Sequence, residues 1–302
     1  MIEIGEIMKK KRKLKRNVLW ILLCFVVLLL LIVIIKNIPT PKKIKETPKE
    51  EEKIKTEEDI KLEKLNHIHK KMDYFKKDFL DRYLTYQEQH PELETIQVIK
   101  NVNMHLDKDF YTDIEEALYP HTKEVLVNKH YALSEGYIPE NLENIDTKYA
   151  IANMKMVHEA RVAFEELSEA ASKENLRILA MSSYRDYYYQ RNLYNQYVNK
   201  DGVEKADTYS ARAGHSEHQT GYATDVYNGK VPFTSFENTE EYIWMKEHAH
   251  EYGFILRYPK EKVHETGYQF ESWHYRYVGL EIAKIIHEKN ITLEEYYATK
   301  KD

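Results

Sequence analysis

The sequence predicts an α+β domain, with a small antiparallel sheet flanked by helices, that follows one N-terminal transmembrane helix. An unbroken apolar run occupies residues 18–35, near the N-terminus. Beyond it, segments with helical and strand-like patterns are interleaved but do not alternate regularly, which favours α+β over a parallel α/β fold. The chain has 302 residues, and the roughly 230 that follow the anchor and a tether suffice for one domain with a real core.

The apolar run VLWILLCFVVLLLLIVII, from Val18 to Ile35, is long enough to cross a bilayer as a helix. Seven basic residues between Lys9 and Arg16 precede it, which predicts a cytoplasmic N-terminus and an extracellular remainder. A cleavable signal peptide is the competing interpretation, but no small-x-small cleavage site follows the run. A lipoprotein would need a small residue before Cys24, where Leu23 stands. We therefore predict a cytoplasmic basic tail at 1–17 and an uncleaved single-pass membrane anchor at 18–36.

Charge and cysteine content narrow the chemistry. The formal net charge of −5 argues against nucleic acid as the main partner. The only cysteine, Cys24, lies inside the apolar run, so the exported part can use neither disulfides nor thiolates. Any metal held there must be bound by histidine, aspartate or glutamate side chains.

Residues 37–64 are rich in proline and mixed charge, which predicts a charged, solvated linker that becomes helical toward its end. The exported domain is expected at 65–302, with a helical lead-in at 65–113 that breaks at His90-Pro91, and a core at about 120–291. Its expected elements follow in chain order: a strand at 124–128, a helix over 150–171, a strand at 176–181, a helix at 186–199, a strand at 222–226, a helix at 240–252 ended by Gly253, strands at 254–257 and 269–278, and two short helices, the last opened by Thr292-x-x-Glu295.

Two segments carry the chemistry: Ser216-Glu-His218-Gln-Thr-Gly221-Tyr-Ala223-Thr-Asp225 and Glu271-Ser-Trp-His274. They contain two imidazoles, one carboxylate and a further glutamate close to the second histidine. A hydrolytic zinc site has the same components, namely three protein ligands, an open position for water and a neighbouring general base.

The spacing of His218 and Asp225 restricts how both could bind one ion. On a helix, seven residues separate them by roughly 10 Å along the axis, whereas ligand atoms on one zinc lie about 3–3.5 Å apart. On an unbroken strand the odd spacing points them to opposite faces. Gly221 resolves this, because a loop that carries His218 can fold back onto the strand that carries Asp225.

Glu271 has the opposite strand parity to His274, so we expect it at the mouth of the strand or on a bulge. There it could take a proton from the attacking water and pass it to the leaving amine. The plain alternative is a chance grouping of polar residues. The flanking Ser216, Gly221 and Ala223, together with the Glu-x-Trp-His segment, favour the site.

The pattern S-x-H-x-x-G-x-A-x-D followed by E-x-W-H resembles the zinc carboxypeptidases that trim peptidoglycan stem peptides. These are the VanY-type D-Ala-D-Ala carboxypeptidases and the related L,D-carboxypeptidases. The likeness covers roughly Leu65 to Ile291 and includes Val125-Leu-Val-Asn128-Lys129, Ser183-Tyr-Arg185-x-x-x-x-Gln190, Ala211-Arg-Ala-Gly-His-Ser-Glu-His218-Gln-Thr-Gly221 and Tyr252-Gly-Phe-Ile-Leu-Arg257-Tyr-Pro259.

This resemblance implies a role for each matching residue: Zn²⁺ ligands His218, Asp225 and His274, catalytic base Glu271, Arg185 on the substrate carbonyl or carboxylate, and Gln190 and Ser216 lining the same cleft. The ordinary alternatives are a surface arginine at 185 and structural roles at 190 and 216. The chain departs from the family pattern at Ala213 and His215, where proline and tyrosine are expected, and at Tyr222, where a smaller aliphatic residue is expected.

The resemblance implies a membrane-anchored zinc carboxypeptidase that removes the C-terminal D-alanine from peptidoglycan stem peptides outside the cell. Three alternatives stay open: an enzyme that cuts the L,D bond of tetrapeptide stems or the D,D bond of cross-links, a non-catalytic zinc-bearing domain that binds cell wall, and an anchor whose working part is the helical lead-in. Among the other histidines, His248 and His250 are expected to be structural, His264 and His287 to lie on the surface, and His215 to contact either the site or its substrate.

Overall fold

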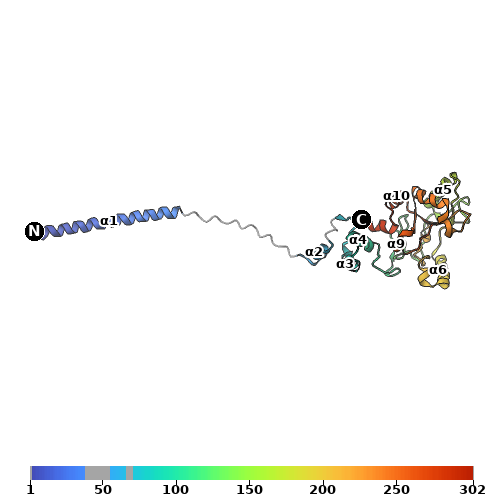
Figure 1. The fold of residues 1–302 in the computed structure, drawn as a ribbon, viewed down its shortest axis with the longest axis horizontal. Helices are drawn as coiled ribbons and strands as arrows, with labels where there is room; N and C mark the ends of the chain where they lie inside the picture. The colour runs from blue at the N-terminus through green and yellow to red at the C-terminus, as the bar shows by residue number, and fades with distance from the viewer. Residues whose placement is uncertain (1, 38–54, 66–70, 302) are drawn as a thin grey trace. The chain divides into compact units, whose positions relative to one another are not determined.

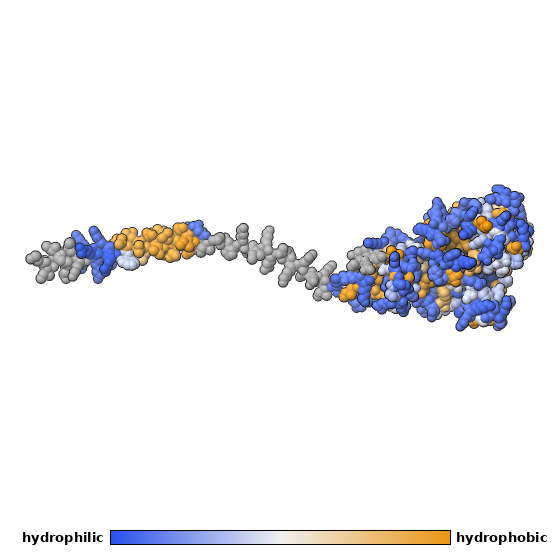
Figure 2. All heavy atoms as spheres, in the orientation of Figure 1, coloured by the Kyte–Doolittle hydropathy of each residue, from blue (hydrophilic) through white to orange (hydrophobic). Residues whose placement is uncertain are grey.

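The computed structural model describes residues 2–37, 55–65 and 71–301, and the chain divides into two compact units, Met1–Ile54 and Lys55–Asp302. The first unit contains one long helix, α1 (Ile2–Lys36), and its Lys10–Lys36 stretch includes an 18-residue window with a mean hydropathy of 3.7. Basic residues precede the apolar stretch along this helix (Figure 2). Its length and composition suit either a membrane span or a signal sequence. Of the linker predicted at 37–64, residues 38–54 lie outside the described residues.

The second unit begins with a helical lead-in. It comprises α2 (Glu57–Lys64), the 3₁₀ turn η2 (Lys77–Phe79), α3 (Leu80–Gln89) and α4 (Thr95–Asn103). Their apolar faces enclose a small core of their own: Leu65, Met72, Leu80, Tyr83, Tyr86, Val98, Ile99 and Val102. The predicted break at His90-Pro91 is present, whereas residues 104–114 form turns rather than the expected helix.

The centre of this unit is a four-stranded antiparallel sheet, in the order β5 (Leu179–Ser182), β6 (Ala223–Tyr227), β8 (His274–Tyr277), β7 (Phe254–Leu256). This arrangement confirms the predicted small antiparallel sheet of an α+β fold. Because β6 and β8 are adjacent and antiparallel, Asp225 and His274 lie directly opposite each other. Each strand therefore contributes one polar residue to the same place.

Helices surround this sheet (Figure 1). The longest, α5 (His158–Lys173), buries Phe164 against Phe254 of β7. The remaining helices and 3₁₀ turns are α6 (Tyr187–Asp201), α7 (Val203–Ala206), η3 (Glu217–Thr220), η4 (Phe233–Asn238), α8 (Glu240–His248), η5 (Ala249–Tyr252), η6 (Lys260–Lys262), α9 (Val263–Thr266), α10 (Leu280–Lys289) and α11 (Leu293–Thr299). As predicted, Gly253 ends η5 in a left-handed conformation and Thr292 caps α11 by accepting a hydrogen bond from the Glu295 backbone N–H.

Three predicted elements are wrong in extent or kind. The helix expected from Ala150 begins only at His158, because residues 155–157 form β4 (Lys155–Val157), paired with β3 (Leu142–Asn144). Ala150, Met154 and Val157 happen to fall at helical spacing before the true helix. The strand expected at 269–278 is confined to β8, since Glu271 to Trp273 form a turn that leads into it.

The strand expected at 124–128 is also wrong. Val125, Leu126 and Val127 are buried, but only Leu126 makes a bridge, to Leu118. The Asn128 side chain accepts hydrogen bonds from two backbone N–H groups just beyond it and so closes a turn. The short parallel pair in this region is β1 (Glu115–Glu116) with β2 (Tyr131–Ala132).

Candidate active site

The loop that carries His218 folds back onto β6 as the spacing predicted. His218 lies in the 3₁₀ turn η3, which ends at Gly221 with a φ of 74°. A Cβ at this position would lie 2.9 Å from a methyl group of Val157, so both backbone conformation and packing require glycine there. The reversal brings His218 back over Asp225, the third residue of β6.

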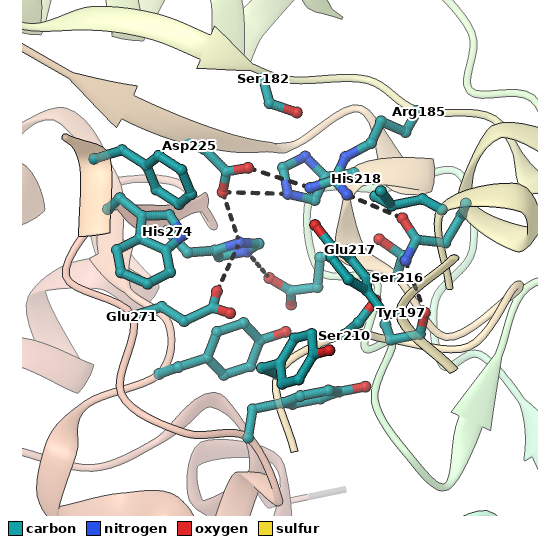
Figure 3. Close-up of a pocket in the computed structure, with 18 of the residues that line it drawn as sticks. Ser182, Arg185, Tyr197, Ser210, Ser216, Glu217, His218, Asp225, Glu271 and His274 are labelled. Carbon is teal, nitrogen blue, oxygen red and sulfur yellow. Dashed lines mark hydrogen bonds and ion pairs between the residues drawn. The ribbon is translucent and has the colours of Figure 1, made fainter. Parts of the chain in front are cut away.

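Three ligand atoms converge at the sheet (Figure 3). Asp225 Oδ1 lies 3.3 Å from His218 Nε2 and 3.1 Å from His274 Nδ1, and the three atoms all lie within 4.8 Å of one another. All three residues are buried. His218 Nε2 and Asp225 Oδ1 make no hydrogen bond within the described part of the chain. Buried polar atoms of this kind normally have partners, and two nitrogens with one carboxylate oxygen suit zinc.

Hydrogen bonds behind the two imidazoles determine which nitrogen of each faces the convergence point. His218 Nδ1 donates to the backbone oxygen of Ser183 at 2.6 Å, which leaves Nε2 as the free lone pair. His274 is turned the other way, because its Nε2 faces Glu217 Oε2 at 3.4 Å and its Nδ1 faces Asp225. The two rings cross nearly at right angles, 89° between planes.

The electrostatics of this cluster favour a positive charge at the shared point. Burial lowers the pKa of His274, but the close carboxylates of Asp225 and Glu217 outweigh it and raise the pKa to about 9. Burial also raises the pKa of Asp225, yet His218, His274 and Arg185 hold it well below its usual range. The carboxylates that favour a proton on His274 would equally favour a metal cation, so the donor set and its charge fit zinc.

Glu271 lies at the mouth of β8, where its strand parity predicted it. Its Oε2 is 3.6 Å from His274 Nδ1, and burial raises the pKa of the Glu271 carboxyl to about 7. A carboxyl group with a pKa near neutrality can both accept and return a proton. Its location beside the three ligand atoms is the one a general base needs.

Arg185 follows β5 and contacts Oδ2 of Asp225, the carboxylate oxygen that does not face His274. It donates to Asp225 Oδ2 at 3.2 Å and to Gln190 Oε1 at 3.0 Å, while Gln190 donates in turn to the Ala211 backbone oxygen at 2.7 Å. The guanidinium Nε has no hydrogen-bond partner among the described residues. The arginine is therefore held in place by two side chains at the wall of the cavity.

These residues share one cavity of about 370 Å³. All seven residues predicted for the site line it: Arg185, Gln190, Ser216, His218, Asp225, Glu271 and His274. The cavity wall also includes five tyrosines, at positions 189, 197, 209, 258 and 268, and Glu217, none of which was predicted from the sequence. The chain contains 25 tyrosines in all, which gives no positional signal for these five.

The other histidines in the described part of the chain lie outside the cavity wall. His215 is buried, and its Nδ1 lies 2.7 Å from the Asn128 backbone oxygen, so it supports the loop before the motif. His248 pairs with Glu251, and His250 stacks on His287 at 3.7 Å between ring centroids. These contacts agree with the structural roles predicted for His248 and His250.

An α+β domain with three converging ligand atoms, a buried carboxyl group of raised pKa and a fixed arginine in one cavity defines a metal-dependent hydrolase. Comparison with known proteins gives the family. Residues 153–280 match the VanY family model, described as D-alanyl-D-alanine carboxypeptidase. The chain is 36% identical over 211 residues to the putative carboxypeptidase YodJ of Bacillus subtilis (strain 168), covering 66% of this chain and 77% of that protein.

Solved structures agree with this assignment. The LdcB LD-carboxypeptidase superposes with a TM-score of 0.58 at 36% identity, over 63% of this chain and 94% of that one. A Zn(II) complex of a variant of the vancomycin resistance D,D-pentapeptidase VanY superposes with a TM-score of 0.51 at 31% identity, over 58% and 98%. The chain belongs to the VanY family of D-alanyl-D-alanine carboxypeptidases and is a zinc-dependent peptidase.

Proposed function

We propose that this enzyme is anchored in the membrane by α1 and removes the C-terminal D-alanine from peptidoglycan stem peptides at the outer face of the membrane. The observation that carries this proposal is the convergence of His218, Asp225 and His274 beside Glu271 and Arg185 in one cavity. A non-catalytic wall-binding domain would not need a buried glutamate of raised pKa next to the ligand atoms.

In this proposal zinc is held by His218 Nε2, Asp225 Oδ1 and His274 Nδ1. Zinc in a site of three protein ligands supplies Lewis acidity, which polarises the substrate carbonyl and makes water more acidic. Ser183 and Glu217, behind the two imidazoles, keep the ligating nitrogens directed at the ion. Burial of the cluster limits competition from bulk water.

Glu271 would handle the protons of the reaction. Its carboxylate takes a proton from the attacking water and then delivers it to the amine of the departing D-alanine. A pKa of about 7 suits both steps, because the group is a strong enough base to accept and a strong enough acid to donate. Both transfers take place at the same buried carboxyl.

Arg185 would explain why the enzyme acts at a chain end. A guanidinium group forms paired, charge-assisted hydrogen bonds with a carboxylate, and the C-terminal D-alanine presents one. Asp225 and Gln190 hold the arginine at the wall of the cavity, beside the expected metal ligands. An internal peptide bond would leave this positive charge without its partner.

The proposal is tested with the full chain in detergent and purified pentapeptide and tetrapeptide stems. We expect D-alanine release from the pentapeptide, its loss with a chelator and its return with added zinc. Release from the tetrapeptide alone would instead establish L,D cleavage, the specificity named for the LdcB structure. No release from either stem by the zinc-loaded protein would refute the carboxypeptidase proposal.

The anchor is tested separately in cells. Seven basic residues before the apolar stretch of α1 favour a cytoplasmic N-terminus, with the catalytic unit outside. We expect the protein in the membrane fraction, with its original N-terminus, and with the catalytic unit open to protease added to intact protoplasts. A mature protein that starts after the apolar stretch would identify a signal peptide.

A further inference from the structure

Glu217, which lies between Ser216 and the expected ligand His218 in the motif, has a fully buried side chain. Glutamate is rarely buried unless its charge is paired, because removing a carboxylate from water costs several kcal/mol. Its neighbours therefore indicate what it does. They divide into two groups, one at each carboxylate oxygen.

Two arginines hold Oε1 of Glu217. Arg257 donates through Nε at 2.7 Å and Arg276 through one terminal nitrogen at 2.8 Å. Both guanidinium groups are fixed in turn, since Arg257 forms a two-bond pair with Glu294 and Arg276 donates to backbone oxygens of Lys123 and Val125. The carboxylate of Glu217 is therefore anchored and cannot rotate freely.

The other oxygen, Oε2, faces His274 Nε2 at 3.4 Å (Figure 3). An ionised carboxylate can only accept, so the imidazole must place its proton on Nε2 to bond with it. In the neutral ring that a metal requires, this leaves Nδ1 as the lone pair, directed at Asp225 Oδ1 and the convergence point. The Ser183 backbone oxygen orients His218 in the same way, because it accepts a hydrogen bond from Nδ1, although this acceptor is uncharged.

We propose that Glu217 is a positioning residue of the metal centre, which holds the His274 ring in the orientation and tautomer that present Nδ1 to zinc. Arg257 and Arg276 keep Glu217 in this position by donating hydrogen bonds to its Oε1. This inference rests on the proposed role of His274 as a zinc ligand. Carboxylates that orient a ligating histidine also raise its basicity, and their loss typically costs about 10–100-fold in metal affinity.

The test is Glu217→Gln in the full chain. The glutamine Oε1 would stay with the two arginines, so its NH₂ group would face His274 Nε2 and force that nitrogen to accept. The proton would then occupy Nδ1, the nitrogen meant for the metal. We expect zinc affinity, measured by competition with a chromophoric chelator, to fall about 10–100-fold, and the visible spectrum of the cobalt-loaded protein to change.

Glu294→Gln is the matched control, because it removes a charge from the same buried network without touching His274. We expect it to lower the unfolding temperature but to leave zinc affinity and the cobalt spectrum as in the wild type. Glu217→Asp is a second variant that keeps the charge opposite the arginines but shortens the reach toward His274. It should fold and also bind zinc more weakly.

Wild-type zinc affinity and cobalt spectrum in both Glu217 variants would overturn this inference, as would an equal loss of affinity in Glu294→Gln. A separate measurement tests whether His274 is a zinc ligand at all. If the His274→Ala variant binds zinc as tightly as the wild type, the proposed ligand set is refuted, and the role of Glu217 with it. Zinc binding that requires His274 but ignores Glu217 would refute only the positioning role.

Discussion

Two places in the catalytic unit hold a pair of buried histidines, and they differ in what surrounds the rings. His218 and His274 lie 4.9 Å apart between ring centroids, and His105 and His130 lie 5.6 Å apart. All four rings are almost completely buried. The first pair faces buried carboxylates, whereas the second packs among aromatic rings, with Phe79 and Tyr131 against His105 and Phe110 against His130. One half-exposed carboxylate, that of Glu115, lies 3.6 Å from His105 Nδ1.

The consequence is that one ring of the first pair, His274, responds to positive charge in the opposite way from both rings of the second pair. Burial lowers the pKa of the other ring, His218, to about 4. Contacts with Asp225 and Glu217 raise the pKa of His274 to about 9 against the effect of burial. Burial is the main cause that lowers the pKa of His105 to about 3 and of His130 to about 4. Burying two imidazoles together is therefore not enough for a metal site. Carboxylates must supply the negative field that a cation needs.

The largest loss of activity is expected when the general base beside the first pair, Glu271, is removed. Glu271→Gln keeps the shape of the side chain but cannot take a proton from water. We expect kcat for D-alanine release to fall about 10²–10⁴-fold, with zinc content unchanged. Enzyme assays and metal analysis of the same preparation measure both quantities. Near wild-type turnover in this variant would show that another group transfers the proton.

Arg185→Lys tests the next largest effect. Lysine keeps the positive charge but loses the planar pair of donors, so it cannot hold Asp225, Gln190 and a substrate carboxylate together. The loss of a charge-assisted hydrogen bond predicts a fall in kcat/KM of about 10–100-fold. An amidated substrate provides the control, because the wild type should lose most of its advantage on it. Equal kcat/KM for wild type and variant on the free acid would contradict the role.

The sequence predicts the first pair of histidines better than the residues that surround it. The meeting of His218 and Asp225 could be predicted because, of the simple arrangements, only a loop folded onto a strand brings both side chains to one point. The family resemblance added His274 to the expected ligand set. Glu217 could not be predicted, since a glutamate beside a ligand has the pattern of a solvated residue. Its partners Arg257 and Arg276 come from segments about forty and sixty residues away, and nothing local indicates that they meet.

The second pair and its surroundings could not be predicted from local sequence patterns. His105 and His130 belong to no motif, and they come together only because the lead-in packs beside β2. The buried run Val125–Val127 has strand composition, but the turn closed by Asn128 leaves it without a ladder. Burial there is decided by tertiary contacts rather than by backbone pairing.

The pH dependence of stability should distinguish the second pair from His274 of the first pair. Both His105 and His130 have a folded-state pKa below the value of about 6.5 expected in the unfolded chain. Unfolding therefore takes up protons below about pH 6.5, so their contribution is complete above that pH and is lost as the pH falls toward 4. Each histidine adds a slope of up to about 1.4 kcal/mol per pH unit.

Urea unfolding at several pH values between about 7 and 5, with a chelator present, measures this slope. His130→Phe places a non-titrating ring among the same aromatic neighbours and should flatten the dependence, whatever it does to absolute stability. The flattening isolates His130, because the groups of the first pair are unchanged in the variant. An unaltered slope would mean that His130 does not stay uncharged in the folded state.

The smallest expected effect comes from Tyr131→Phe. The Tyr131 hydroxyl is the hydrogen-bond partner of His105 Nε2, at 3.1 Å in a buried setting, and His105 Nδ1 makes no hydrogen bond within the described residues. Removing the hydroxyl should lower the free energy of unfolding by about 1 kcal/mol. It should leave kcat/KM and zinc affinity unchanged, because no atom of this pair lines the active-site cavity. A fall in zinc affinity in Tyr131→Phe would show that the two histidine pairs are coupled, and the contrast between a structural pair and a metal-binding pair would no longer hold.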